Sequence, residues 1–291
     1  MFMSLIICTK DRAPQLRDCL KEVAAASPPP CEMEIVIVDN GSRDDTPSVI
    51  ADFAAASALK VERVLCQTPG LGRARNAGLA VAKGEWVLFT DDDCYGETAF
   101  FENFFGFADL AAASDGQAKD IRYGGGPVQP YDGQHDPRIA SLAVEKIKLI
   151  APKTLMGPGT IQGANMFFHR SIFENVGRFN ERMGSGTPFA CEDIEMAARA
   201  SWAGYLGAQV PFFKVVHHHK RLIGSVEAQA TVEQYDFGKG AYLASLMQSG
   251  IFDIWRLWEA CSPLQYMSDP KFRARLVREL EGAANYLKAL P

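Results

Sequence analysis

The sequence predicts an α/β fold, in which a mostly parallel sheet is flanked by helices and followed by a helical C-terminal extension. Three observations support this prediction. Strand-like and helix-like segments alternate along the first part of the chain, an order typical of parallel sheets built from β-α-β units. Polar residues follow several predicted strands, at the sheet edge where such folds bind ligands. From about Ser225 onward the chain shows only helix-like patterns.

The first part of the chain contains four short runs of aliphatic, β-branched and aromatic residues, which are typical of buried strands. These predicted strands are Leu5–Cys8, Glu34–Val38, Val61–Leu65 and Glu85–Phe89. The helices predicted between them cover residues 10–26, 44–57 and 71–83. Pro14 suits the first turn of the first helix, and Gly84 suits the end of the third.

Beyond Asp93 the predicted elements alternate less regularly. Helices are predicted at residues 98–110, 139–150 and 192–202, and strands at residues 121–129, 160–169 and 210–217. Glycines 124–126 interrupt the first of these strands, which is typical of a close backbone approach. The glycine-rich segment 184–188 predicts a flexible loop just before the last of these helices.

Composition excludes several classes of protein. Hydrophobic residues make up 47% of the 291 residues and the net charge is −5, so no overall basic field favours nucleic acid. Seven cysteines without CxxC spacing indicate reduced thiols rather than a disulfide framework or a zinc site. The N-terminal segment lacks a signal-peptide pattern, and no run of about 18 apolar residues predicts a membrane span. We therefore expect a cytoplasmic protein.

Three consecutive acids follow the apolar run that ends at Phe89. The carboxylates of Asp91, Asp92 and Asp93 repel one another unless a cation lies among them, and hard divalent cations prefer carboxylate oxygens. Alternation along an extended chain points Asp91 and Asp93 the same way and Asp92 the other way. The alternative is an acidic surface turn. The pattern favours a divalent metal site at the carboxyl end of a strand.

Four motifs occur in an order that closely resembles the family-2 glycosyltransferases. They are the Val-Asp-Asn-Gly-Ser turn at 38–42, the Arg-Asn-Ala-Gly stretch at 75–78, the acids at 91–93 and the Glu192-Asp193 pair. The resemblance extends over roughly residues 3–220. It implies the GT-A fold, a Rossmann-like and mostly parallel sheet, and the inverting transfer of a sugar from a nucleotide diphosphate donor.

The resemblance also implies a domain organisation. A GT-A glycosyltransferase domain would cover residues 1–220, with a nucleotide-binding half at 1–95 and an acceptor-binding and catalytic half at 96–220. Residues 221–291 would form the helical extension.

The donor is expected at the ends of the first strands. The donor-binding residues that the resemblance implies are Thr9, Arg12, Asp39, Ser42, Gly72, Arg75, Asn76, Asp91 and Asp92. Asp39 would accept a hydrogen bond from uracil N3–H, which favours a UDP-sugar; its alternative role is to cap the Asn40–Gly41 turn. Arg75, near a helix N-terminus, suits a diphosphate or base clamp. Gly72 and Asn76 share a helix face that a ligand can approach closely.

The resemblance implies a Mn²⁺ or Mg²⁺ cofactor that neutralises the leaving diphosphate. Asp93 would ligate this ion, and Asp91 would contact the ribose or the ion through a bound water. His217 and His219 share a face of the last predicted strand, and one of them would complete the metal site. The alternative is a surface histidine run beside Lys220.

Glu192 and Asp193 are the candidate catalytic residues. Inversion requires a carboxylate that takes the proton from the acceptor hydroxyl, and the resemblance assigns this role to Asp193. Adjacent helical residues point about 100° apart, so Glu192 would instead affect the acceptor. The alternative is that both acids cap the helix, with Glu195 and Arg199 forming an ordinary surface pair.

The favoured function is a hexosyltransferase that acts on a carbohydrate or lipid-linked acceptor, as in polysaccharide biosynthesis. A nucleotidyltransferase and a non-catalytic nucleotide- or carbohydrate-binding protein stay open. The aromatic segment Ile251–Trp258 leaves two alternatives for the C-terminal extension. Its helices pack on the catalytic domain, or they make a peripheral contact with the inner face of the membrane.

Overall fold

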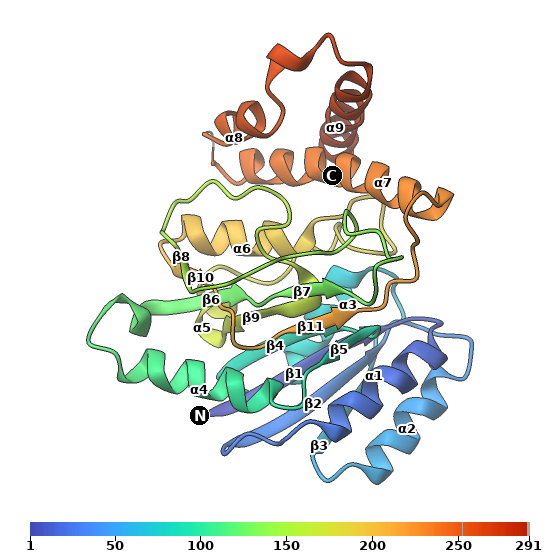
Figure 1. The fold of residues 1–291 in the computed structure, drawn as a ribbon, viewed down its shortest axis with the longest axis vertical. Helices are drawn as coiled ribbons and strands as arrows, with labels where there is room; N and C mark the ends of the chain where they lie inside the picture. Colours follow the sequence, from blue (N-terminus) through green and yellow to red (C-terminus); the bar gives the residue numbers. More distant parts are fainter. Residues whose placement is uncertain (252, 290–291) are drawn as a thin grey trace.

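A computed structural model describes residues 1–251 and 253–289. Within these residues, eight strands form one sheet in the order β3-β2-β1-β4-β9-β6-β10-β8, and three form a smaller sheet in the order β5-β11-β7 (Figure 1). The strands are β1 (Phe2–Thr9), β2 (Glu32–Asp39), β3 (Lys60–Leu65), β4 (Trp86–Asp91), β5 (Cys94–Gly96), β6 (Ile121–Gly125), β7 (Val128–Pro130), β8 (Lys148–Ile150), β9 (Met166–His169), β10 (Leu206–Gln209) and β11 (Val215–His217). The helices are α1 (Ala13–Ala25), α2 (Thr46–Ala56), α3 (Leu71–Val81), α4 (Phe100–Ala113), α5 (Arg170–Asn175), α6 (Glu192–Trp202), α7 (Val226–Gln248), α8 (Ile254–Cys261) and α9 (Pro270–Lys288).

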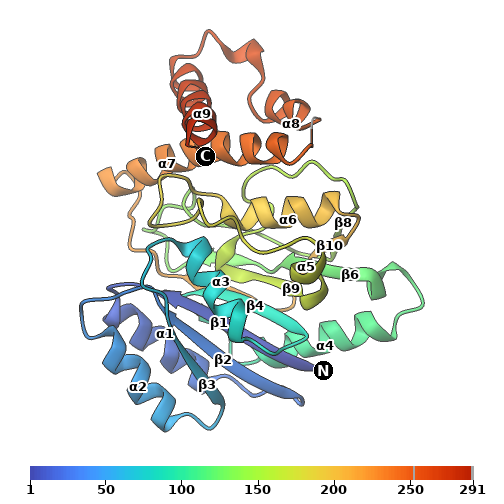
Figure 2. The same cartoon turned by 180° about the vertical axis from the view of Figure 1, so that it is seen from behind.

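The parallel half of the large sheet consists of β1 to β4, with β1 between β2 and β4. Successive residues of β1 face opposite sides: Ile6 packs in the cluster that includes α3 and α6, and Leu5 and Ile7 pack toward α1, α2 and α4. Helices therefore cover both faces of the sheet (Figures 1 and 2). Burial on both faces explains why these strands are continuous apolar runs. The predicted α/β fold with a helical extension is confirmed.

Three elements of the second half differ from the prediction. Residues 139–150 are not a helix but an extended loop that ends in β8, which pairs with β10. Leu142 exchanges two backbone hydrogen bonds with Val128, and this pairing keeps the loop extended. Of the strand predicted over 160–169 only β9 forms, after a 3-10 turn. Of the strand predicted over 210–217 only β11 forms, because Pro211 cannot donate to a ladder after β10 ends.

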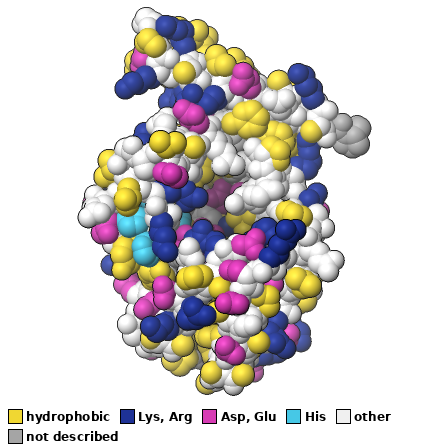
Figure 3. Space-filling view, turned by 90° about the vertical axis from the view of Figure 1, so that its right-hand side faces the viewer, with side chains coloured by type: hydrophobic (Ala, Val, Ile, Leu, Met, Phe, Trp, Pro, Cys, Tyr) yellow, Lys and Arg dark blue, Asp and Glu magenta, His cyan; other side chains and the backbone are white. Residues whose placement is uncertain are grey.

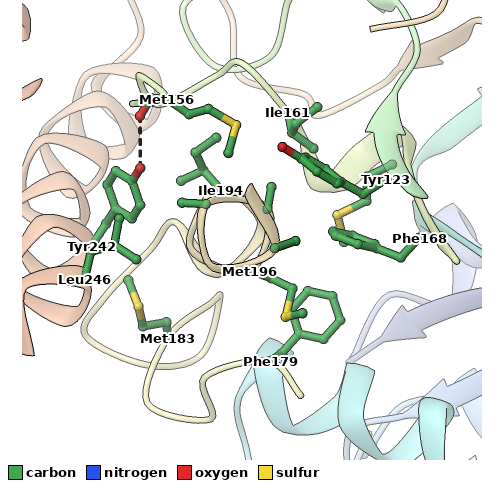
Figure 4. Packing of buried hydrophobic residues seen from close by; sticks show 14 of the residues in the cluster. Tyr123, Met156, Ile161, Phe168, Phe179, Met183, Ile194, Met196, Tyr242 and Leu246 are labelled. Carbon is green, nitrogen blue, oxygen red and sulfur yellow. Dashed lines mark hydrogen bonds between the residues drawn. The ribbon is translucent and has the colours of Figure 1, made fainter. Parts of the chain in front are cut away.

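The C-terminal extension packs against the rest of the chain through α7, which contacts both α6 and α9. In Figure 4, Tyr242 and Leu246 of α7 lie beside Ile194 of α6 in one hydrophobic cluster. The Tyr242 hydroxyl donates a hydrogen bond of 2.9 Å to the carbonyl oxygen of Met156. The extension therefore shares a hydrophobic core with the sheet domain.

A close helix crossing and a buried polar network hold the extension together. A Cβ at Gly240 of α7 would lie 1.7 Å from the Glu279 carbonyl oxygen of α9, so only glycine permits this approach. The Lys239 ammonium donates to Glu279 Oε1 and to Ser262 Oγ, each at 2.8 Å. Trp258 Nε1 donates to Glu279 Oε2 at 2.8 Å. One carboxylate thus joins α7, α8 and α9.

The aromatic segment of the extension mostly faces inward. Ile254 and Leu257 are buried, whereas Trp255 is 53% exposed. Phe252 lies outside the described residues. Among the residues that the structure describes, no helix combines the length and the apolar character needed to cross a bilayer. Peripheral membrane contact stays a prediction.

Candidate active site

A cavity of about 660 Å³ lies at the carboxyl ends of β1 and β4. Loop 158–164, the start of α6 and the first half of α7 form its opposite side. Figure 3 shows a hollow in this face of the molecule, with acidic side chains inside it and Lys, Arg and His side chains at its margin. Ligands of open α/β sheets bind at this edge, so the cavity is the candidate active site.

Four potential metal ligands converge at one end of the cavity. Donor atoms of Asp91, Asp93, Cys94 and His217 all lie within 4.8 Å of one another. His217 is in this position because β11 pairs with β5, and the register places His217 opposite Cys94. Carboxylates and imidazole suit Mn²⁺, and carboxylates alone suit Mg²⁺. Burial raises the pKa of the Cys94 thiol well above its usual value, and Mn²⁺ and Mg²⁺ prefer oxygen ligands to sulfur.

Arg12 binds the acids of this region in a set that we call the floor cluster: Arg12, Asp92, Asp93 and His217. Arg12 Nε lies 2.9 Å from Asp92 Oδ1, and Arg12 Nη2 contacts Asp93 Oδ2. His217 Nε2 lies 3.0 Å from Asp93 Oδ1, and Thr9 Oγ1 donates to Asp92 Oδ2 at 2.7 Å. Arg12 was predicted to line the base pocket with Thr9; its guanidinium instead lies on the carboxylates.

The two buried acids of the floor cluster differ in pKa. Burial raises the pKa of Asp92 to about 7, against the opposing charge of Arg12. Burial also opposes ionisation of Asp93, but the hydrogen bond and charge of His217, together with Arg12, hold the pKa of Asp93 well below its usual range. Asp93 is therefore the acid of the floor cluster that ionises more readily, and its role as a metal ligand stays a prediction.

The predicted base pocket at the end of β2 is built from a tight turn. Asp39 Oδ1 accepts a hydrogen bond of 2.8 Å from the Ser42 N–H, so the capping alternative for Asp39 is realised in the structure. Ser42 Oγ accepts from the Asp11 N–H at 2.9 Å, and Lys10 Nζ donates to the carbonyl oxygen of Gly41 at 2.9 Å. No contact tests the uracil role of Asp39.

Gly72 and Asn76 do not face the cavity, which corrects their assignment to the donor site. A Cβ at Gly72 would lie 2.5 Å from the Asn180 carbonyl oxygen. Asn76 exchanges two hydrogen bonds of 2.9 Å with the Phe179 backbone. Both residues hold α3 against loop 179–183. The lack of a side chain at Gly72 therefore serves packing within the chain and not ligand approach.

Arg75 is also placed differently from the prediction. Its guanidinium is only 3% exposed and contacts Glu192 Oε1, with Asp91 Oδ1 at 3.6 Å. The rings of Phe89 and Phe179 lie 5.9 and 5.5 Å from the guanidinium carbon. Arg75 lines the cavity, but its charge is already paired with Asp91 and Glu192. It therefore links β4 to α6, and its guanidinium is not free to bind a diphosphate. We call Arg75, Glu192 and Asp193 the wall cluster.

Asp193 lies where α6 meets the cavity. Its Oδ2 accepts a hydrogen bond of 2.7 Å from the Gly163 N–H, and its Oδ1 accepts one of 2.8 Å from the Ile194 N–H. The chain enters the helix through Cys191 in the left-handed conformation, with φ of 79°. Burial raises the pKa of Asp193, and raises that of Glu192 to about 7, against the opposing charge of Arg75.

The residues that follow on α6 are not a surface pair. Glu195 is buried, binds Arg199 Nη2 at 2.9 Å and accepts a hydrogen bond of 3.1 Å from Ser245 Oγ. This pair fixes α6 against α7. The surface alternative given for Glu195 and Arg199 is therefore wrong.

His219 does not join the group of potential metal ligands. Its ring packs 5.3 Å from that of His217 and 5.2 Å from that of His135. Its Nδ1 accepts the Arg221 N–H at 3.1 Å, and burial together with the charge of His217 lowers the pKa of His219 to about 4. His219 therefore supports the ring of His217 instead of sharing its role.

The sequence interpretation missed two features of the site. Cys94 lies within the group of potential metal ligands and directly follows the three acids, so its position was a usable signal. The α7 residues Thr231, Gln234 and Tyr235 also line the cavity, and no motif marks them.

The model of the family described as Glycosyl transferase family 2 matches residues 4–177. The chain belongs to glycosyltransferase family 2. Glycosyltransferase AglE of Haloferax volcanii is 27% identical over 207 residues, covering 70% of this chain and 62% of AglE. The poly(ribitol-phosphate) β-N-acetylglucosaminyltransferase TarS of Staphylococcus aureus is 34% identical over 95 residues, 33% of this chain and 17% of TarS. This chain thus spans less than two thirds of either relative.

Two examples among solved structures share the fold of this chain. The mannosyltransferase PcManGT from Pyrobaculum calidifontis, in complex with GDP-Man and Mn²⁺, has a TM-score of 0.62 at 18% identity over 99% of this chain and 76% of PcManGT. S. aureus TarS 1-349, in complex with UDP-GlcNAc, has a TM-score of 0.57 at 16% identity over 100% of this chain and 82% of TarS 1-349. Both likenesses support the GT-A fold.

Proposed function

We propose that this protein is a metal-dependent, inverting glycosyltransferase that moves a hexosyl group from a UDP-sugar to a hydroxyl group of a carbohydrate or lipid-linked acceptor. One observation carries the proposal: a single cavity contains both the potential metal ligands Asp91, Asp93 and His217 and the buried carboxyl group of Asp193. Metal ligands and a proton acceptor are the two parts that a metal-dependent inverting transfer uses.

The residues divide the work between leaving group and nucleophile. Mn²⁺ or Mg²⁺, held by Asp93, Asp91 and His217, would supply positive charge to the leaving diphosphate. Asp193 takes the proton from the acceptor hydroxyl while the acceptor oxygen bonds to the anomeric carbon and the bond to the diphosphate breaks. The two N–H groups that bind Asp193 hold its carboxyl group in place. Its raised pKa makes the carboxylate a stronger base.

The printed titles of the structural neighbours support a nucleotide-sugar donor, with UDP-GlcNAc in one and GDP-Man with Mn²⁺ in the other. The choice of UDP rests on Asp39, at the carboxyl end of β2. A nucleotidyltransferase or a binding protein would use the same metal ligands but would not need Asp193. Slow, metal-dependent hydrolysis of a UDP-sugar without an acceptor separates the enzyme from a binding protein.

Calorimetry with UDP, GDP and TDP in the presence of Mn²⁺ tests the donor. We expect UDP to bind most tightly, because the carboxylate of Asp39 accepts a hydrogen bond from uracil N3–H. A preference for GDP would overturn the uracil assignment but not the family. Equal affinity in EDTA would overturn the metal dependence.

A further inference from the structure

One positively charged residue of the cavity, Arg221, has no predicted role in binding the donor or the metal. Arg221 follows β11 and lines the same cavity as Asp193. Its Nη1 lies 3.4 Å from the carbonyl oxygen of His219. Among the residues that the structure describes, no acid forms an ion pair with Arg221. Arg221 therefore differs from Arg12 and Arg75, whose charges are paired within the chain.

A neighbouring arginine provides an internal comparison. Arg138 lines the cavity as well, but it binds the buried carboxylate of Asp136 through Nε and Nη2, at 3.0 and 2.6 Å. Its guanidinium fork is thus occupied. The fork of Arg221 offers several N–H donors that lack a carboxylate partner, in the geometry that binds a carboxylate or phosphate through two parallel hydrogen bonds.

The backbone holds Arg221 in a fixed position. Its N–H donates to His219 Nδ1 at 3.1 Å, and its carbonyl oxygen accepts from the Asp136 N–H at 2.9 Å. The next residue, Leu222, forms a bridge with His135. A charge on an anchored backbone loses less conformational freedom when it binds a ligand than a charge on a loose loop.

Tyr235 of α7 connects Arg221 with the candidate base, because burial raises the pKa of Tyr235, the charge of Arg221 lowers it and the charge of Asp193 raises it. Helix α7 passes the chain just before α6 in close contact, because a Cβ at Gly238 would lie 2.7 Å from the Cβ of Ala190. This contact places Tyr235 and Thr231, one and two turns earlier on α7, along the cavity with Arg221. The acceptor hydroxyl must reach Asp193, and Thr231, Tyr235 and Arg221 line the same cavity.

We propose that the acceptor carries an anionic group, a phosphate or a carboxylate, and that Arg221 binds this group while Thr231 and Tyr235 contact the adjoining sugar. The proposal rests on the proposed function, since it assumes that the donor fills the other end of the cavity. Charge-assisted hydrogen bonds to an anion make Arg221 a specificity-determining residue for the acceptor.

The test uses the full chain saturated with UDP and Mn²⁺, so that the donor diphosphate site is already filled. Glucose 6-phosphate, glucuronate and neutral glucose are titrated as probes, with binding followed by ligand-observed NMR. We expect at least one of the two anionic probes to bind about tenfold more tightly than glucose. Arg221→Gln removes this preference. Arg63→Gln, which removes an exposed arginine on β3, keeps it.

The UDP titration of the same proteins separates the two proposals. If UDP with Mn²⁺ does not bind the wild-type chain, the proposed function fails first. If UDP binds, equal or undetectable binding of the charged and neutral probes overturns the anionic acceptor. A preserved preference in Arg221→Gln also overturns it. The proposal is also overturned if Arg221→Gln loses UDP affinity tenfold and keeps the preference for anionic probes. Arg221 would then bind the donor.

Discussion

The floor cluster and the wall cluster each combine neighbouring acids with one arginine, but only the floor contains an acid with a lowered pKa; the pKa of its other acid, Asp92, is raised as in the wall. The arginine is Arg12 in the floor and Arg75 in the wall. The Arg12 side chain is 32% exposed and that of Arg75 only 3%. In the floor, Asp93 keeps a lowered pKa, whereas burial raises the pKa of both Glu192 and Asp193 in the wall.

The difference shows that an arginine does not by itself decide the charge of a nearby acid. Desolvation opposes ionisation in both clusters. The pKa of each acid then depends on how many positively charged or hydrogen-bonding partners stabilise its ionised form. Asp93 has two cationic partners, Arg12 and His217. Asp193 accepts only backbone hydrogen bonds. One cluster thus contains an acid that is ionised by its cationic partners, and the other contains acids whose burial favours the bound proton.

The largest expected effect follows from burial of the two arginines. Arg75→Met leaves Glu192 buried without its partner, and we expect a loss of about 3–5 kcal/mol in the free energy of unfolding. Arg12→Met costs about 1–2 kcal/mol, because water reaches this position and Asp93 keeps His217. Urea denaturation of both variants measures the difference. Equal losses would contradict the role assigned to burial.

The second effect concerns proton transfer. Asp193→Asn keeps the size of the side chain but cannot accept the proton, so transfer falls by a factor on the order of 10² or more. UDP affinity stays near that of the wild type. The matched variant Glu192→Gln is milder. Rates with a saturating donor decide, and an active Asp193→Asn beside an inactive Glu192→Gln would reverse the assignment.

The third effect separates the two acids of the floor. Asp93→Ala removes an anionic ligand, and we expect the metal-dependent part of UDP affinity to fall about tenfold or more. Asp92→Ala has a smaller effect, because Asp92 is held by Thr9 and Arg12. Calorimetry with Mn²⁺ and with EDTA gives both values. Unfolding of Asp93→Ala, checked by circular dichroism, would indicate that the acid is structural.

The last effect is the pH dependence of stability in the wall. The folded protein holds the proton of Glu192 between its ordinary pKa of 4.5 and its raised pKa of about 7. Native protein then binds more protons than unfolded protein, so this group's contribution to stability is lost as pH rises through that range. Glu192→Gln removes this slope, which we expect to total at most about 3 kcal/mol over the range between the two pKa values. Thermal unfolding at several pH values measures it. An unchanged slope would show that the proton is not held there.

Sequence patterns predicted the floor better than the wall for a physical reason. The three acids are contiguous and follow a strand, so their position needs only local structure. Arg75 contacts an acid 117 residues away, and nothing local indicates that this acid neutralises it. The loop at 139–150 failed as a helix because its backbone pairs with β7 and β10, partners that periodicity does not show.

The contribution of α7 to the cavity was not predictable from the sequence. Thr231 and Tyr235 reach the cavity because Gly238 packs on Ala190, a tertiary contact that sets the position of the helix. The motif pair Glu192-Asp193, by contrast, begins α6 at the predicted residue. The roles of Asp193 as the catalytic base and of Glu192 toward the acceptor stay predictions.

The carboxylate of Glu279 has a consequence for how this sequence can change over generations. It lies fully buried between three helices, and Lys239 is its ammonium partner. Loss of Glu279 would leave the Lys239 ammonium in the interior without a carboxylate, whereas loss of Lys239 would leave Glu279 with Arg275, whose Nε lies 3.4 Å from Oε1. Descendants of this chain that lose Glu279 should therefore also lose Lys239, and this one-way dependence would mark the contact between α7 and α9 in an alignment.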